Sequence, residues 1–227
     1  MRRISFFKQI DNIYVIIMAI TTIFFDIGEV LFADCDTHIN RMISERYSVP
    51  EERVYHARRE LWQRFGTGDM TEDEFWRGVY QKCDIKYGLS DIDWIKAEIV
   101  IEPFNSNIAL LERLKDVGYF LGIISNHSKE WSHRIMATEG FSVHFDYVVF
   151  SCDDNVKCLK PNEGIYHAAL RYCGETPESC LFVDNKQANI DAAVKLGMNG
   201  FVYNRRGEQD LEVMLKQQGI SFDVSKC

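Results

Sequence analysis

Apolar positions in the second part of the chain follow two alternating patterns. From about residue 104 onward, short continuously apolar runs alternate with segments in which apolar residues recur every three or four positions. The runs are typical of buried strands and the periodic segments are typical of helices. This alternation indicates parallel βαβ units, and so an α/β fold built on a doubly wound, Rossmann-like parallel sheet. The predicted strands are Ile23–Phe25, Tyr119–Ile124, Tyr147–Phe150, Cys180–Val183 and Gly200–Tyr203.

Glycines mark the ends of predicted helices between these strands. One helix with apolar positions spaced three apart begins near Ile108 and stops at Gly118, and a second runs to Tyr172 and stops at Gly174. A third helical pattern extends over 190–198. Pro161 suits the first turn of the second helix, where its missing N–H costs nothing.

The segment between the first two predicted strands contains no clear strand signal. Four helical faces follow one another there, and the third is preceded by the capping-box pattern Thr71-x-x-Glu74. An all-helical insertion directly after the first strand suggests a cap over the sheet edge, and the alternative is a packed subdomain without a moving role. The predicted divisions are a core of residues 18–34 and 104–227, a helical cap of residues 35–103, and an N-terminal extension of residues 1–17 that the fold does not require.

Composition and charge exclude several classes of protein. A hydrophobic content of 46% in 227 residues supports a real core, and a net charge of −8 argues against a nucleic-acid partner, whose phosphates would need a basic face. The apolar stretch that ends at Phe25 covers only 13 residues, which is too short to span a bilayer, and no small-residue cleavage site separates its first part, 13–20, from the first predicted strand. We therefore expect no membrane partner.

Seven cysteines are scattered along the chain without a CxxC pair. This usage is typical of reduced thiols in a cytoplasmic protein rather than of a disulfide framework or a zinc site. Cys35, Cys83 and Cys180 stand in apolar surroundings and are expected to fill the core.

The candidate chemistry lies where predicted strands end. Asp26 follows the apolar run of the first strand, at the edge where ligands bind in open α/β folds, although an Asp that simply begins a loop gives the same pattern. Ser125 ends the second strand and suits an anionic oxygen, although a helix cap is the common role of such a serine. Lys160 precedes a helix, and an isolated Lys-Pro would ordinarily be a surface lysine.

Asp184 is a second carboxylate at the end of a buried strand. Two carboxylates at neighbouring strand ends repel each other unless a cation lies between them. Hard oxygen ligands favour Mg²⁺ over transition metals, so we expect Mg²⁺ as the cofactor.

Four motifs in order resemble those of the haloacid dehalogenase-like hydrolase superfamily, in its helical-cap phosphatase branch of sugar-phosphate and epoxide-hydrolase-N-terminal-like members. Each motif alone is weak, but four in order, each after a predicted strand, are specific. The segment from Gly66 to Phe75 is also similar to cap sequence of that branch. The motifs are Asp26-x-Gly-x-Val, Ser125-Asn126, Lys160-Pro161 and Val183-Asp184-Asn185.

The resemblance implies a role for each motif. Asp26 would be the nucleophile that accepts a phosphoryl group. Ser125 and the Asn126 N–H would hold phosphoryl oxygens, and Lys160 would neutralise charge near Asp26. Asp26, the Gly28 carbonyl and Asp184 would bind Mg²⁺.

Two positions depart from the family pattern. Gly28 stands where phosphatases of the superfamily usually carry a second Asp as general acid and base, and its absence would cost on the order of 10²–10⁴-fold in leaving-group protonation. Asn185 stands where a second Asp is frequent. It can hold a metal-bound water, but the lost charge should weaken Mg²⁺ affinity.

The leading hypothesis is a Mg²⁺-dependent phosphatase that hydrolyses a small phosphorylated metabolite, with sugar phosphates among the candidates, through an aspartyl-phosphate intermediate. The second is a catalytically impaired binding or regulatory protein of the same fold, motivated by Gly28 and Asn185. The third is a 2-haloacid dehalogenase, which also uses an Asp nucleophile and needs no metal. That branch normally has Asp-x-Tyr-Gly-Thr at the nucleophile, which this chain lacks.

Residues in the predicted cap or at its hinge are weaker candidates for substrate contact. Each has a structural role as the simpler interpretation. They are Asp34, Asp36, His38, Trp62 and Phe65. His127 and His133 follow the second motif and are expected to face solvent.

Overall fold

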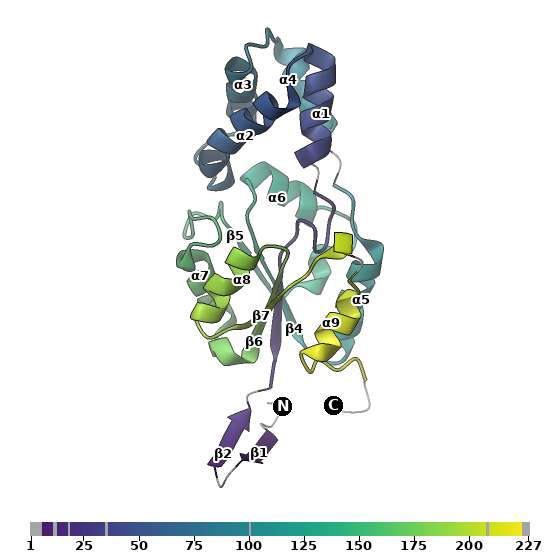
Figure 1. The fold of residues 1–227 in the computed structure, drawn as a ribbon, viewed down its shortest axis with the longest axis vertical. Coiled ribbons are helices and arrows are strands. Elements are labelled where there is room, and N and C mark those ends of the chain that lie inside the picture. Colours follow the sequence, from purple (N-terminus) through teal and green to yellow (C-terminus); the bar gives the residue numbers. More distant parts are fainter. Residues whose placement is uncertain are drawn as a thin grey trace.

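The computed structural model describes residues 6–10, 13–17, 19–34, 36–99, 101–207 and 209–223. An α/β core carries a group of helices over one end of its sheet (Figure 1). The core sheet has the strand order β5-β4-β3-β6-β7, and every pairing in it is parallel. This confirms the predicted fold class. The strands are β3 (Thr22–Phe25), β4 (Phe120–Ser125), β5 (Tyr147–Phe150), β6 (Cys180–Asp184) and β7 (Asn199–Val202), each within one residue of its predicted bounds.

The register of the central strand brings three strand ends together. Phe25 at the end of β3 lies beside Ile123 of β4 and Val183 of β6. The Asp26 N–H then donates to the Val183 carbonyl at 2.8 Å, so the residue after the strand stays against β6. The carboxyl ends of all three strands therefore open on the same edge, beneath the cap.

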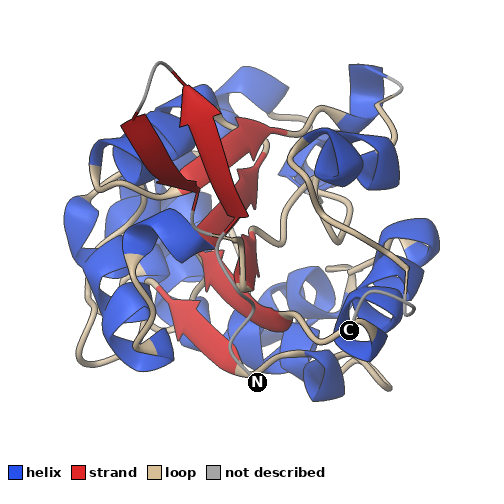
Figure 2. Cartoon of the chain, turned by 90° about the horizontal axis from the view of Figure 1, so that it is seen from below, coloured by secondary structure: helices blue, strands red, loops and turns tan. Residues whose placement is uncertain are grey.

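Helices cover both faces of the sheet, as Figure 2 shows from below. Ile23 and Phe25 of β3 pack with α5, α6 and α9, whereas Phe24 points to the other face and packs with α7 and α8. This alternation is why the strand is continuously apolar. The core helices are α5 (Asn105–Asp116), α6 (Lys129–Met136), α7 (Glu163–Cys173), α8 (Gln187–Lys195) and α9 (Leu211–Gln217), with 3-10 turns at Ser142–His144, Pro177–Ser179 and Arg205–Gly207.

The ends of α7 show one confirmed and one wrong prediction. Gly174 ends the helix in the left-handed region, with φ of 65°, where a glycine avoids the Cβ clash. The helix does not include Pro161 in its first turn, because Asn162 caps it by accepting a hydrogen bond from the Gly164 N–H at 2.9 Å. Pro161 therefore lies in the loop that carries Lys160.

The cap has a hydrophobic core of its own. The rings of Phe65 and Phe75 stack with centroids 4.2 Å apart, and Trp76 packs edge-on against Phe75. Thr71 and Glu74 form the capping box that the sequence predicts. The cap helices are α1 (Asp36–Tyr47), α2 (Glu51–Gly66), α3 (Glu72–Lys82) and α4 (Leu89–Ala97).

The predicted N-terminal extension contains a separate hairpin. Strands β1 (Phe6–Ile10) and β2 (Ile13–Ile17) pair antiparallel in a two-stranded sheet apart from the core sheet. That the fold does not require residues 1–17 stays a prediction. Among the described helices, none combines the length and the apolar character that a membrane crossing needs.

Cysteine placement agrees with the sequence where the structure describes it. Cys83 and Cys180 are buried in the core, and both are free thiols. Cys35 lies outside the described residues.

Candidate active site

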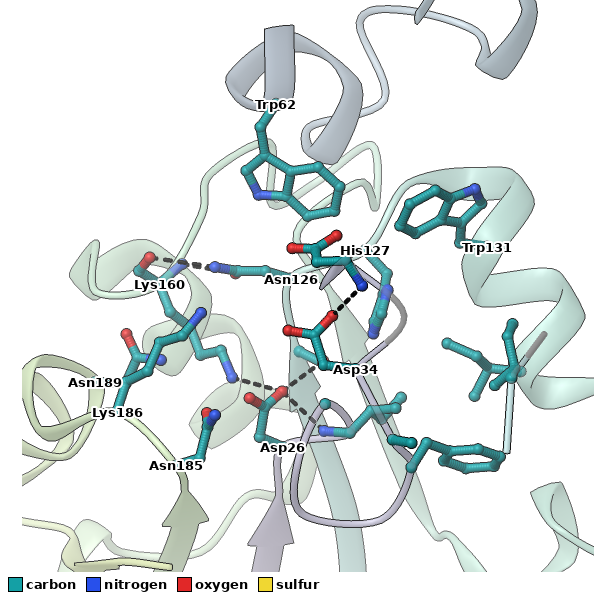
Figure 3. A pocket seen from close by; sticks show the side chains of 18 of the residues that line it. Asp26, Asp34, Trp62, Asn126, His127, Trp131, Lys160, Asn185, Lys186 and Asn189 are labelled. Carbon is teal, nitrogen blue, oxygen red and sulfur yellow. Dashed lines mark hydrogen bonds and ion pairs between the residues drawn. The ribbon is translucent and has the colours of Figure 1, made fainter. Parts of the chain in front are cut away.

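A cavity lies between the carboxyl edge of the sheet and the cap. Core residues Asp26, Ser125 and Lys160 line its floor, and Trp62 of α2 reaches over it from the cap (Figure 3). Apolar side chains from both parts, among them Phe32 and Trp131 of the core and Ile99 of the cap segment, complete much of the wall. A small polar molecule with an apolar face would fit this mixed lining.

Asp26 is almost fully buried and is held in one orientation. Its Oδ1 accepts hydrogen bonds from Ser125 Oγ at 2.6 Å and from the Ile27 N–H at 2.8 Å, and it lies 2.8 Å from Lys160 Nζ. Burial alone would raise the pKa of Asp26, but the Lys160 charge and these hydrogen bonds hold it below the ordinary value. The carboxylate form is therefore favoured. Its Oδ2 has no hydrogen-bond partner among the described residues.

Lys160 bridges the two site carboxylates. Its Nζ lies 2.7 Å from Asp184 Oδ2 as well as 2.8 Å from Asp26 Oδ1, and it donates to the Ile124 carbonyl at 2.9 Å. The side chain is 1% exposed. The lysine is thus a buried cation and not a surface residue.

Asn126 fixes the backbone of this lysine. Its side-chain oxygen accepts the Lys160 N–H at 2.8 Å, and its amide donates to the Lys160 carbonyl at 3.2 Å. The Asn126 side chain therefore acts on the loop, and only its backbone N–H is left for the predicted phosphate contact.

Asp184 is fully engaged, whereas its neighbour Asn185 is not. Asp184 Oδ1 accepts the Lys186 N–H at 2.8 Å, and Oδ2 accepts from Lys160 and from Asn189 Nδ2 at 2.9 Å. Burial and the Asp26 charge raise the pKa of Asp184. Asn185 Oδ1, in contrast, is a buried oxygen without a hydrogen-bond partner in the described part of the chain.

These unpaired oxygens fit a hard cation. Asp26 Oδ2, the buried Asn185 Oδ1 and the Gly28 carbonyl are the donor types that Mg²⁺ takes. No group of three or more His, Cys, Asp or Glu side chains among the described residues could hold a metal. Few carboxylates would therefore balance the charge of a bound cation. Direct ligation by Asp184, as the sequence predicts, would compete with the hydrogen bonds that it already accepts.

The prediction that His127 faces solvent is wrong. It lines the cavity, and its Nδ1 is buried without a partner among the described residues. Desolvation lowers the pKa of His127 to about 4, so the ring is neutral at pH 7. His127 precedes Ser128, the cap of α6, so helical periodicity could not place it. His133, within α6, is exposed as predicted.

We expect His127 to make stability depend on pH in a defined window. The unfolded ring titrates near 6.5 and the folded ring near 4, so the unfolded state binds more protons between these values and stability falls as the pH falls through that range. Urea unfolding at pH 7.5 and pH 5 should show about 1–2 kcal/mol more loss in wild type than in His127→Gln. An equal loss in both proteins would contradict this assignment.

The cavity also tests the weaker candidates. Asp34, Asp36 and Trp62 line it, whereas Phe65 is buried in the cap core and exposed His38 is not part of the lining. Sequence reasoning missed Arg58, Arg59, Trp131, Lys186 and Asn189. Lys186 and Asn189 follow the Asp184 motif directly and could have been found there. Whether Arg58, Arg59 and Trp131 line the cavity depends on how the cap packs on the core, which the sequence does not show.

A buried glutamate joins cap and core. Glu72 at the start of α3 accepts hydrogen bonds from Trp131 Nε1 at 2.8 Å and, with both oxygens, from Arg134 at 2.8 and 2.6 Å. The Glu72 side chain is 3% exposed. We call Glu72, Trp131 and Arg134 the cap–core latch.

The fold and this arrangement of carboxylates and lysine define a hydrolase. A family model of haloacid dehalogenase-like hydrolases matches residues 20–197, so the chain belongs to that family. A glyceraldehyde 3-phosphate phosphatase of Methanothermobacter thermautotrophicus is 30% identical over 89% of this chain and 93% of its own. An (S)-2-haloacid dehalogenase of Burkholderia cepacia is 32% identical over 43% of this chain and 41% of its own.

Solved structures agree on the fold. An enzyme of this family from Bacteroides thetaiotaomicron, crystallised with magnesium and inorganic phosphate, superposes with a TM-score of 0.68 at 19% identity. The match covers 86% of this chain and 99% of that one.

Proposed function

We propose that this protein is a Mg²⁺-dependent phosphatase that hydrolyses a small phosphorylated metabolite through an aspartyl-phosphate on Asp26. One observation carries the proposal: Asp26 is a buried carboxylate held ionised by Lys160, with its second oxygen unpaired and facing a cavity. A buried carboxylate without such a partner would take up a proton and lose its nucleophilicity.

The chain's own residues divide the reaction between them. Asp26 attacks phosphorus, and the bond to the leaving oxygen breaks; a water then attacks the aspartyl-phosphate and releases inorganic phosphate. Lys160 and Ser125 orient the Asp26 carboxylate, and the Asn126 N–H can donate to a phosphoryl oxygen. A bound Mg²⁺, held by Asp26, the Gly28 carbonyl and the Asn185 side chain, would offset the negative charge of the phosphoryl group. Asp184 keeps Lys160 in place.

Similarity and lining together support the substrate class. A relative that matches over 89% of this chain is named for a three-carbon phosphate. The cavity of this chain offers cationic Arg59 and Lys186 as well as aromatic Trp62. A short polyol or sugar phosphate, or a related small phosphate ester, suits this combination.

A haloacid dehalogenase is the competing function. Curated dehalogenases match less than half of this chain, and the Asp26 and Lys160 pair would serve that chemistry as well. The unpaired Asn185 oxygen favours the phosphatase. A buried acceptor without a hydrogen bond is unfavourable, and a bound Mg²⁺ would satisfy it, whereas a metal-free dehalogenase would leave it unsatisfied.

Turnover in chelator separates the two functions. We expect hydrolysis of 4-nitrophenyl phosphate with Mg²⁺ and its loss with EDTA, with recovery on adding excess Mg²⁺. Release of halide from 2-chloropropionate should be absent in both conditions. Halide release that EDTA leaves unchanged would instead establish the dehalogenase, and no turnover of either compound would favour a binding protein.

A further inference from the structure

Gly28 leaves the proposed phosphatase without its usual proton donor. An alkoxide leaving from a phosphate ester is a strong base, so its departure is slow unless a nearby acid protonates it. A glycine has no group that could do so. If the protein hydrolyses alkyl phosphates, another residue of the cavity has to supply this proton.

Most titratable groups in the cavity are already committed. Asp26 and Lys160 hold each other, and Asp36 is bound by the Arg58 guanidinium. His127 is neutral with a pKa of about 4, so it carries no extra proton near pH 7. Lysine, arginine and tyrosine side chains ordinarily titrate far above neutral pH. Asp34 is the carboxyl that remains in the described lining.

We propose that Asp34 is the general acid and base of this site, taking the role that Gly28 cannot fill. Asp34 lines the same cavity as Asp26, and Figure 3 shows its carboxyl group in the opening between Asp26 and His127. Its Oδ1 accepts the Asp36 N–H at 2.8 Å, which fixes the side chain. Its Oδ2 has no partner among the described residues and is left to contact substrate.

The backbone around Asp34 is held at the base of the cap. The Asp34 N–H donates to Glu29 Oε1 at 3.0 Å, and Arg206 in turn donates to both Glu29 oxygens at 3.0 Å. The N–H of the preceding Ala33 donates to the carbonyl of Glu102, in the segment that leads back from the cap to α5, at 2.9 Å. A donor on such a fixed segment keeps its position relative to the nucleophile.

The charges around Asp34 favour its protonated form. Desolvation raises the pKa of Asp34, and the Asp36 and Glu29 charges add to this effect, while the Asp36 N–H and the Lys186 charge act against it. Neutral His127 also faces the same part of the cavity. Asp34 therefore keeps its proton to higher pH than an ordinary Asp, as a donor must.

The proton balance closes over one turnover. As the bond from phosphorus to the leaving oxygen breaks, the proton of the Asp34 carboxyl moves to that oxygen, and the alcohol departs. The Asp34 carboxylate then takes a proton from the water that attacks the aspartyl-phosphate. Inorganic phosphate leaves and Asp34 is again protonated.

This inference rests on the proposed function, and leaving-group dependence tests it. Asp34→Asn keeps the Oδ1 that accepts the Asp36 N–H but has no acidic proton. With saturating Mg²⁺, we expect kcat on an alkyl phosphate such as glycerol 1-phosphate to fall on the order of 10²-fold or more, and kcat on 4-nitrophenyl phosphate to fall less than about 10-fold. The alkyl-phosphate pH profile should also lose its basic limb.

Two further variants separate proton donation from structural damage. Asp93→Asn, at an exposed position of α4 outside the cavity, is the matched control and should keep both rates. Gly28→Asp in the Asp34→Asn background should restore part of the alkyl-phosphate rate, because a Cβ at Gly28 meets no described atom within 4 Å. In wild type the same change should add little.

Each outcome decides the question. Equal losses on both substrates, or an unchanged alkyl-phosphate rate, in Asp34→Asn would overturn the role of Asp34 while leaving the phosphatase itself intact. A wild-type protein without turnover that depends on Asp26 would overturn the proposed function, and the inference with it.

Discussion

Asp26→Asn is expected to lose activity by more than ~10³-fold, because an amide cannot attack phosphorus and the nucleophile has no substitute within the cavity. The change should leave the fold intact. Asn keeps an Oδ1 for the Ser125 hydroxyl and the Ile27 N–H, and Lys160 keeps Asp184 as its counter-ion. The measurement is kcat on 4-nitrophenyl phosphate with Mg²⁺, beside a thermal melt of both proteins.

Trapping of the intermediate supplies a second readout for this variant. Wild type stopped by acid during turnover should carry phosphate on an aspartyl residue, and Asp26→Asn should carry none. A variant that keeps more than a few per cent of the wild-type rate, or that still becomes phosphorylated, would assign the nucleophile to another residue.

Lys160→Met should destabilise the protein by about 3–5 kcal/mol and remove activity. Its loss leaves Asp26 and Asp184 buried side by side without a cation, and an uncompensated buried charge is costly. The size of the penalty should depend on pH. Without Lys160 both carboxyl pKa values rise, so the variant regains stability as the pH falls and the carboxyls take up protons.

Urea unfolding at pH 7.5 and pH 5.5 measures this effect. The control is Lys195→Met, which removes an exposed ion pair with Glu163 and should change the unfolding free energy by less than about 0.5 kcal/mol. A Lys160→Met protein as stable as wild type at pH 7.5, or one whose deficit grows on acidification, would show that the lysine does not compensate both carboxylates.

The strands and the residues at their ends could be predicted from sequence because both depend on local pattern. A strand buried on both faces is continuously apolar, and it stops where polarity begins, so Asp26, Ser125 and Asp184 are visible in the sequence at the sheet edge. The parallel order then brings them together.

Contacts across loops were not predictable in the same way. The hydrogen bonds between the Asn126 side chain and the Lys160 backbone join residues 34 positions apart, and no periodic pattern in the sequence predicts such a contact. His127 was misplaced for a related reason, since it lies before α6, where helical periodicity does not apply, and its ring packs edge-on against Phe150 of β5. The sequence also does not show that Asp34 Oδ1 accepts the Asp36 N–H, which leaves Oδ2 as the oxygen that can contact substrate.

The cap–core latch should impose a free-energy barrier on entry into the cavity, and the barrier depends on the size of the incoming molecule. Lifting α3 from α6 separates Glu72 from Arg134 and Trp131, which breaks charge-assisted hydrogen bonds to a carboxylate that is almost fully buried. A compact molecule that reaches the floor with α3 in place escapes this cost. A bulky molecule can enter only when these hydrogen bonds are broken. We therefore expect association rate constants to be lower for bulky phosphate esters than for compact ones, whatever their relative rates of hydrolysis.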